Sequence, residues 1–435
     1  RLRRRVTRPV APTSASIPAP APDADVSPAA LGAVDAPLAA ALVGLVAFGV
    51  VMVYSASAVF ADHTFHDGQH YFVRQAAYAV AGLGLMAAAA RFDYHRLRRL
   101  TYPILLAVVA LMGVVALGFG HRAGGATRWI ALGPIHVQPS ELAKLALVLW
   151  LAYSLSKKSE RMHTFSIGFL PHVIVAGLLM LLCLLQPDFG SAIMIGLLTF
   201  VLLFAGGAKI GYLLGAVLCA LPAGYALIAR SPYRMRRIVA FLDPFEHLRG
   251  AGYQVAESLM SYGAGGVTGV GLGDSRQKLF FLPEAHTDFI GAIVGEELGF
   301  VGTVCLVLVF AFVVYRGVRV AMRAADDYGA YLATGATVFV GLQAFTNLAV
   351  AMGMVPTKGL VLPFISYGGS SLLVNCAAVG VLLSVSRGRD ALEHVAPEER
   401  ARPSQALDAR GGRGRASRAL ERHAADAIAT TGGTP

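Results

Sequence analysis

Charged side chains are scarce in this sequence. Asp, Glu, Lys and Arg make up 14% of its 435 residues, whereas hydrophobic residues make up 56% and the mean hydropathy is +0.60. A soluble domain usually carries ~25% charged residues, so the composition excludes an ordinary soluble protein. Apolar runs of ~18 residues or more recur, each long enough to cross a bilayer as a helix. The ~10-residue alternating segments of a membrane β-barrel are missing, so we predict an all-α integral membrane protein.

Ligand-binding cysteine and glycine patterns are lacking as well. The glycines between residues 263 and 273 do not form GxGxxG between a strand and a helix, so they predict close packing or turns and no dinucleotide site. No internal repeat of ~20–50 residues is present, which excludes a solenoid. The four cysteines stand singly in apolar stretches without a CxxC pair or a histidine cluster, which predicts small core residues: Cys183, Cys219, Cys305 and Cys376.

The apolar runs predict about ten transmembrane helices in one membrane domain, residues 36–386. An N-terminal arm, residues 1–35, and a C-terminal tail, residues 387–435, are expected to be disordered, because they are rich in charge, proline or glycine. A long loop, residues 230–286, separates the seventh and eighth helices. The predicted helices are 36–61, 71–90, 101–119, 139–155, 168–185, 189–206, 209–229, 287–315, 328–352 and 359–386.

The distribution of lysine and arginine predicts the orientation in the membrane. Basic residues in the short loops after the second, fourth and eighth helices fall on the same side as the basic N-terminus, which places both termini in the cytoplasm. The formal charge of +11 is therefore explained by topology, and no nucleic-acid partner is expected. Arginines also occur in the opposite loops, 120–138 and 230–286, and these cations on the disfavoured side indicate an anionic ligand there.

Asp288 stands where the long loop enters the eighth predicted helix. Its carboxylate could simply be stabilised by the helix dipole, or the dipole could keep it ionised as a general base requires. By residue type, Glu284 and Glu257 are alternatives. Glu296 and Glu297 lie ~12 Å deeper at 1.5 Å per residue, where a carboxylate is costly, so at least one is expected to pair within the bundle.

Two further polar groups interrupt apolar segments. Glu141 and Lys144 are spaced i, i+3 after Pro139 and can form an intramembrane ion pair; a structural salt bridge and a ligand role are both open. Asp188 follows a Gln-Pro pair between two helices, where it either caps the sixth helix or contributes to an outward cavity.

The last two predicted helices are rich in hydroxyls and glycines, especially at residues 363–371. Close helix packing would explain them, and so would a polar groove that opens to the outer leaflet. Lys358 stands at the outer end of such a groove and could meet a phosphate.

Six ordered blocks make the chain resemble the SEDS family (shape, elongation, division, sporulation) over residues 38–386. The segments 283–288 and 356–359 resemble the cell-division branch more than the elongation branch. The blocks are RW (128–129), PSELAK (139–144), QPD (186–188), LPEAHTDF (282–289), GEELG (295–299) and PFISYGGSS (363–371).

The resemblance implies a SEDS-type helix bundle and a peptidoglycan glycosyltransferase that polymerises lipid II outside the bacterial cytoplasmic membrane, at the division septum. By that similarity Asp288 matches an essential aspartate, while Glu141, Lys144 and Asp188 match polar positions linked to activity. A class B penicillin-binding transpeptidase and other divisome membrane proteins are the implied partners, beside membrane lipids. The expected substrate-binding residues are Arg128, Trp129, Glu141, Lys144, Asp188, Arg234, Arg236, Arg237, Glu284, His286, Lys358, Ser366, Tyr367, Ser370 and Ser371.

The resulting hypothesis gives Asp288 the role of general base in an inverting displacement, so that no enzyme nucleophile and no second carboxylate are required. The departing undecaprenyl pyrophosphate would be stabilised by arginines of the long loop, by Lys358, or by a divalent cation, Mg²⁺ or Mn²⁺. No cofactor and no ligand-spaced metal cluster is identifiable in the sequence. A lipid II flippase, a divisome scaffold and an enzyme of the elongation branch that resembles RodA are the alternative functions.

Overall fold

The computed structural model describes residues 34–123, 126–133, 135–248, 250, 252–357 and 359–401. Most of the predicted N-terminal arm and the chain beyond residue 401 lie outside these residues, and so does Lys358. The last helix runs to Ala401, so it does not end at residue 387, where the tail was expected to begin.

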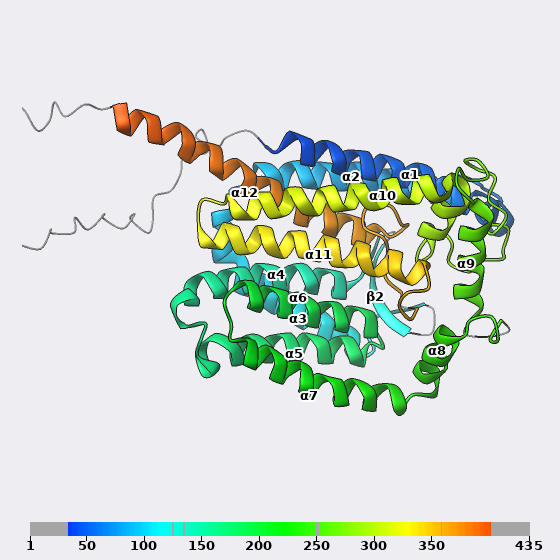
Figure 1. The fold of residues 1–435 in the computed structure, drawn as a ribbon, viewed down its shortest axis with the longest axis horizontal. Helices are drawn as coiled ribbons and strands as arrows, with labels where there is room; N and C mark the ends of the chain where they lie inside the picture. The colour runs from blue at the N-terminus through cyan, green and yellow to red at the C-terminus, as the bar shows by residue number, and fades with distance from the viewer. Residues whose placement is uncertain are drawn as a thin grey trace, which may run out of the picture.

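The described chain is mostly helical, with a small antiparallel sheet (Figure 1). The helices are α1 (Ala36–Phe65), α2 (His70–Arg91), α3 (Leu97–Ala116), α4 (Pro139–Lys158), α5 (Leu170–Leu185), α6 (Phe189–Ala205), α7 (Ile210–Ala229), α8 (Pro232–Leu242), α9 (Tyr253–Gly265), α10 (Ile290–Met322), α11 (Asp327–Ala351) and α12 (Gly369–Ala401). The strands are β1 (His121–Ala123), β2 (Ala126–Leu132) and β3 (Ile135–Val137), in the order β1-β2-β3.

The long helices run side by side as a bundle, and eight of those described are long and apolar enough to cross a membrane. A ninth, α6, is apolar but shorter. Helices α11 and α12 form much of the core, with about 70% of their apolar windows buried, whereas the window of α7 is 6% buried and faces outward. This arrangement confirms an all-α integral membrane protein, while the count of ten spans stays a prediction.

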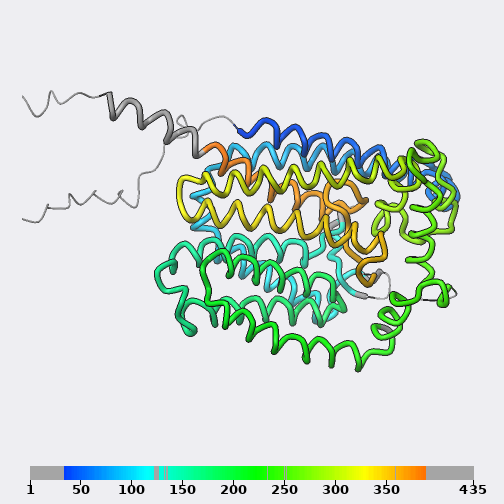
Figure 2. The backbone as a smooth tube through the Cα atoms, viewed as in Figure 1, coloured from blue at the N-terminus to red at the C-terminus, as the bar shows by residue number. Residues whose placement is uncertain are grey.

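One end of the bundle carries most of the non-membrane structure. Helices α8 and α9 stand across that end, at the right of Figure 2, in the segment that was predicted to be a loop. The predicted loop 120–138 contains the three-stranded sheet. The last predicted helix corresponds to α12, which begins at Gly369 rather than at residue 359. The chain through Pro363 forms a turn before it, in which the Ser366 hydroxyl accepts a hydrogen bond from the Leu362 amide at 2.8 Å.

Helix α10 is interrupted at Gly299, where φ is 66° and ψ is −163°. The glycine-rich segment after α9 supplies hydrogen-bond partners for the backbone groups at this break. The amides of Val270 and Gly271 donate to the carbonyls of Glu296 and Glu297 at 3.0 and 3.1 Å, and the Phe300 amide donates to the segment in return. Backbone groups in lipid need partners, so this exchange replaces the missing helical bonds and explains the glycines that the sequence places there.

We expect Gly299→Ala to destabilise the protein by at least ~1–3 kcal/mol. The positive φ disfavours any side chain, and an added Cβ would lie 2.3 Å from the amide nitrogen of Gly269. The measurement is the apparent melting temperature in detergent. Gly44→Ala is the matched control, since a Cβ at that helical position in α1 meets nothing within 4 Å. Equal melting temperatures for the two variants would contradict the assignment of the break to glycine.

Candidate active site

Asp288 lies at the end of the bundle that carries α8 and α9, just before α10. Its backbone carbonyl accepts a hydrogen bond from Asn347 Nδ2 at 2.9 Å, and the same amide group donates to the Leu360 carbonyl at 2.6 Å. A Cβ added to Gly359 would lie 3.4 Å from Asp288 Oδ2. Asn347 of α11 therefore ties the segment before α10 to the connection before α12, and the Asp288 carboxylate faces that connection.

The electrostatic surroundings of Asp288 differ from those expected from a helix dipole. Phe289 occupies the N-cap position of α10, and no side chain caps the helix. Burial raises the pKa of Asp288 to about 7, and the charge of Glu284 adds to the rise, whereas Arg237 and Arg128 lower it. Desolvation thus outweighs the stabilisation by cations. A carboxyl group that titrates near neutral pH suits proton transfer at that pH.

The two arginines whose charges lower the pKa of Asp288 come from separate elements. Arg237 of α8 donates through Nη1 to the Thr357 carbonyl at 3.3 Å. Arg128 of β2 donates through Nε to the Gln186 carbonyl at 3.2 Å and also bonds the Pro187 carbonyl. The sheet and α8, which the sequence reading treated as loops, therefore deliver cations to the acid.

The other predicted cations are placed differently. Arg234 lies over the Phe189 ring at 5.3 Å, at the start of α6. Arg236 is exposed and donates to the Pro232 carbonyl of its own helix at 3.3 Å. Of the three arginines on α8, only Arg237 is among the charges that act on Asp288. Trp129 is half-buried in β2 beside Arg128, opposite His121 of β1.

His286 is packed in an aromatic cluster beside the acid. Its ring lies 5.8 Å from Phe60, 4.6 Å from Tyr71 and 5.9 Å from Tyr367. The Tyr367 amide donates to the His286 carbonyl at 2.9 Å. Burial lowers the pKa of His286, so its ring is neutral at pH 7. This cluster anchors the segment that holds Asp288 to α1 and α2.

Glu284 is the second carboxylate near Asp288. It has a positive φ of 58°, and its Oε2 accepts a hydrogen bond from Thr287 Oγ1 at 2.8 Å. Its influence on Asp288 is electrostatic, because its negative charge favours the protonated form of the neighbouring acid.

Arg74 of α2 belongs to the same end of the bundle and was missed in the sequence reading. Its guanidinium acts on the Tyr367 hydroxyl and opposes the rise in the pKa of that group that burial causes. A signal was available, because Arg74 is the single charged residue between positions 71 and 90, and a charge within an apolar run marks a functional or structural polar site.

Glu141 and Lys144 form an ion pair inside the bundle, with 2.6 Å between Lys144 Nζ and Glu141 Oε1. The two residues are 3% and 0% exposed. Ser371 of α12 donates to Glu141 at 3.4 Å, and Lys144 lies 5.5 Å from the Phe339 ring of α11. The geometry favours the structural alternative, a buried bridge that joins α4 to α11 and α12.

Asp188 also has structural partners. It accepts hydrogen bonds from the Ser191 amide at 3.1 Å, which caps α6, and from Ser140 Oγ of α4 at 2.8 Å. Its exposed fraction is 4%, so the capping alternative agrees with the structure better than a place in an open cavity. The hydroxyls of Ser366, Ser370 and Ser371 are likewise engaged in hydrogen bonds within the protein.

Glu296 and Glu297 form a separate polar network where α10 meets the glycine-rich segment. Glu297 pairs with Lys278 at 3.2 Å and accepts from Ser55 of α1 at 2.6 Å, and Glu296 accepts from the Arg276 amide at 2.9 Å. The expected pairing within the bundle is confirmed. A cavity of about 570 Å³ opens beside this network, lined by α1 and residues 272–279. Within the described ranges, no cluster of three or more His, Cys, Asp or Glu side chains could hold a metal ion.

Residues 36–391 match a family model described as "Cell cycle protein", which covers FtsW, RodA and SpoVE. The chain is 49% identical over 345 residues to a probable peptidoglycan glycosyltransferase FtsW of Geobacter metallireducens, a match that covers 79% of this chain and 92% of the relative. It is 41% identical over 349 residues to stage V sporulation protein E of Bacillus subtilis, covering 79% and 94%.

Solved structures have the same architecture. A chain described under "Structural coordination of polymerization and crosslinking by a peptidoglycan synthase complex" aligns with a TM-score of 0.70 and 31% identity, covering 82% of this chain and 98% of that one. The rod shape determining protein RodA of Thermus thermophilus aligns with a TM-score of 0.61 and 28% identity over the same shares.

Proposed function

Because the chain belongs to the FtsW, RodA and SpoVE family of cell cycle proteins, we propose that it is a peptidoglycan glycosyltransferase that polymerises lipid II during septal cell-wall synthesis. The observation that carries the proposal is the carboxyl group of Asp288, with a pKa raised to about 7 and two arginines beside it. An acid of this kind can accept a proton, and the arginines can stabilise an anionic leaving group.

The proposed reaction is a single displacement. Asp288 takes the proton of the 4-hydroxyl of a GlcNAc residue as that oxygen attacks the anomeric carbon of MurNAc on a second substrate. The bond between that carbon and the pyrophosphate oxygen breaks, and the electron pair leaves with undecaprenyl pyrophosphate. Inversion turns the α-linked donor into a β-linked product, so the enzyme needs one base and no covalent intermediate.

Arg237 and Arg128 are the cations that we assign to the departing diphosphate. Both lower the pKa of Asp288, so their charges act at the acid, and they come from two separate elements, α8 and β2. Preorganised cations stabilise charge that develops in a transition state without further reorganisation. Arg234 and Arg236 are directed to other contacts and are assigned no part in this step.

The rate of polymerisation is expected to fall as the pH is lowered through about 7. The base works only when ionised, and burial raises the pKa of Asp288 to about 7, so the rate decreases tenfold per pH unit well below that value. Initial rates between roughly pH 5.5 and 8.5 in detergent provide the measurement. A profile for the natural protein that stays flat through pH 7 would contradict this assignment.

The membrane topology completes the proposal. Helices α8 and α9 and strand β2 lie at the end of the bundle opposite to the start of α1 (Figure 1), and Asp288 stands two residues before α10, which starts at the same end. The active face is therefore assigned to the outer side and both termini to the cytoplasm. A class B penicillin-binding transpeptidase is the proposed partner, since one structural relative belongs to a peptidoglycan synthase complex described as coordinating polymerisation and crosslinking. Other divisome membrane proteins are proposed to join it.

The decisive experiment incubates the purified protein in detergent with labelled lipid II, with and without the partner transpeptidase. Glycan strands in either reaction support the enzyme. A flippase makes no glycan in detergent, and a scaffold contributes none beyond the partner alone, so the absence of polymer in both reactions would overturn the proposal. Chelation of divalent cations in the same assay separates a reaction assisted by Mg²⁺ or Mn²⁺ from one that uses the arginines alone.

A further inference from the structure

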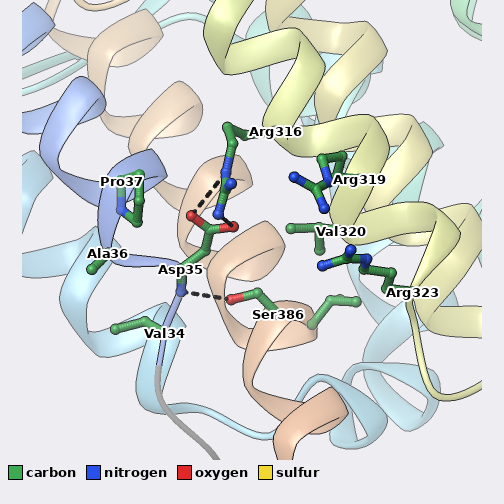
Figure 3. Close-up of a pocket in the computed structure, with 10 residues that line it drawn as sticks. Val34, Asp35, Ala36, Pro37, Arg316, Arg319, Val320, Arg323 and Ser386 are labelled. Carbon is green, nitrogen blue, oxygen red and sulfur yellow. Dashed lines mark hydrogen bonds and ion pairs between the residues drawn. The ribbon is translucent and has the colours of Figure 1, made fainter.

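A basic cavity of about 320 Å³ (Figure 3) lies where α1 begins, at the end of the bundle opposite to α8 and α9 (Figure 1). It is bounded by the start of α1, the last turns of α10 and the segment of α12 around Ser386. Arg316 and Arg319 of α10 and Arg323, the residue that follows its last turn, are spaced i, i+3 and i+7 and line the cavity together with a single carboxylate, that of Asp35. The lining therefore has an excess of two positive charges.

Asp35 holds one of these arginines in place. Arg316 donates through Nε to Asp35 Oδ1 at 3.2 Å and through Nη2 to Oδ2 at 2.6 Å, while the Asp35 amide donates to Ser386 Oγ at 3.2 Å. The carboxylate also caps α1 by accepting from the Leu38 amide. The bidentate pair therefore fixes one wall of the cavity and uses the charge of Arg316.

The other two arginines supply the excess charge. Figure 3 shows the guanidinium groups of Arg319 and Arg323 turned toward the side of the cavity formed by Asp35 and Arg316. Arg319 lies 5.8 Å from the ring of Tyr315 on its own helix. Each guanidinium offers several donors in a fixed plane, which matches the oxygens of a phosphate group.

An apolar stripe on α10 adjoins the arginines. Tyr315, Val318 and Met322 precede the three arginines by one residue each, and they are 56%, 45% and 74% exposed. One residue is about 100° of helical rotation, so this stripe runs along the neighbouring face and points away from the bundle. A bound free phosphate would leave this apolar surface uncovered, whereas the acyl chains of a phospholipid would cover it.

We propose that this cavity binds the phosphate headgroup of an anionic phospholipid, with Arg319 and Arg323 on the phosphate and the acyl chains along the Tyr315–Met322 stripe. The site is separate from the catalytic end and does not depend on the proposed glycosyltransferase activity. Basic residues near a membrane contribute about a factor of five each to the affinity for anionic lipid, so the pair accounts for roughly thirtyfold.

The test is native mass spectrometry of the full-length protein in detergent, titrated separately with phosphatidylglycerol, phosphatidylcholine and inorganic phosphate. We expect one phosphatidylglycerol to be retained preferentially, and Arg319→Gln with Arg323→Gln to weaken that binding roughly thirtyfold, to the level of phosphatidylcholine. Arg96→Gln with Arg99→Gln is the matched control, because it removes the same charge from exposed positions at the start of α3 that do not line the cavity.

The outcomes are distinct. If Arg319→Gln with Arg323→Gln retained phosphatidylglycerol as well as the natural protein does, the proposal would be overturned. An equal loss of phosphatidylglycerol binding in the control variant would overturn it too. Displacement of the lipid by millimolar inorganic phosphate alone would show a free-anion site and would also overturn it. Arg319→Lys with Arg323→Lys keeps the charge, and partial recovery of lipid binding in that variant excludes misfolding as the cause of the loss.

Discussion

Asp288→Asn is expected to lower the rate of lipid II polymerisation by ~10²–10⁴-fold, the usual loss when a general base is removed. The amide keeps the size of the carboxyl group but cannot accept the proton of the attacking hydroxyl. The Asp288 carbonyl remains available to Asn347, so the segment before α10 keeps its anchor. Binding of lipid II should persist, because the arginines beside residue 288 are unchanged.

The stability of this variant separates a catalytic loss from a folding defect. The pKa of Asp288 is raised by burial, so the native state is progressively destabilised as the pH rises from about 4 to about 7, and the full cost of the buried carboxylate is present above that. Asparagine removes that charge, and we expect an apparent melting temperature equal to or above that of the natural protein at pH 8. Polymerisation at a near-normal rate would refute the assignment of the base.

Glu246→Gln is the matched control for the loss of one carboxylate. Glu246 is exposed and lies in the same connection between α7 and α10. It should leave the polymerisation rate and the melting temperature unchanged. A comparable loss of rate in this control would show that the end of the bundle responds to net charge and not to a base at residue 288.

Lys144→Met is expected to destabilise the protein by about 3–5 kcal/mol. The change leaves the Glu141 carboxylate buried without its cation, and an uncompensated buried charge is costly. The double variant Glu141→Gln with Lys144→Met leaves no buried charge and should recover most of the stability. Apparent melting temperatures of the singles and the double in detergent form a double-mutant cycle.

The same cycle decides between the two roles of the pair. If the bridge is structural, the double variant recovers polymerisation together with stability; recovered stability without activity would favour contact with a ligand. Lys157→Met serves as the control, because Lys157 is exposed at the far end of α4. A Lys144→Met protein as stable as this control would contradict the buried-bridge assignment.

The positions of the membrane helices followed from the sequence to within a few residues in most cases. Predicted segments such as 36–61 and 189–206 correspond to α1 and α6. In a bilayer the backbone of a long apolar run must form its hydrogen bonds internally, as a helix. The local hydropathy of the sequence is therefore enough to locate these helices. The largest differences concern α12, which ends at Ala401 instead of residue 386 and begins at Gly369 instead of residue 359. The late start arose in a segment whose apolar character continues through a turn.

The composition of the candidate site was only partly predictable. Asp288, Arg237, Arg128 and His286 were all selected from the sequence, yet their mutual arrangement depends on α8 and β2, which were expected to be loops. Lys358 lies outside the described residues and stays a prediction. Arg74 was overlooked because its partner, Tyr367, is almost three hundred positions away in the chain.

Hydropathy along the chain was enough to establish a helical membrane protein, because hydropathy is a sum over neighbouring residues; the side of the membrane on which the candidate residues lie stays a prediction from the charge distribution. The protonation of Asp288, the burial of Glu141 with Lys144 and the break of α10 at Gly299 had to come from the folded molecule. These properties depend on desolvation and on partners from remote segments, and a charge or a backbone group acquires them only when those segments meet.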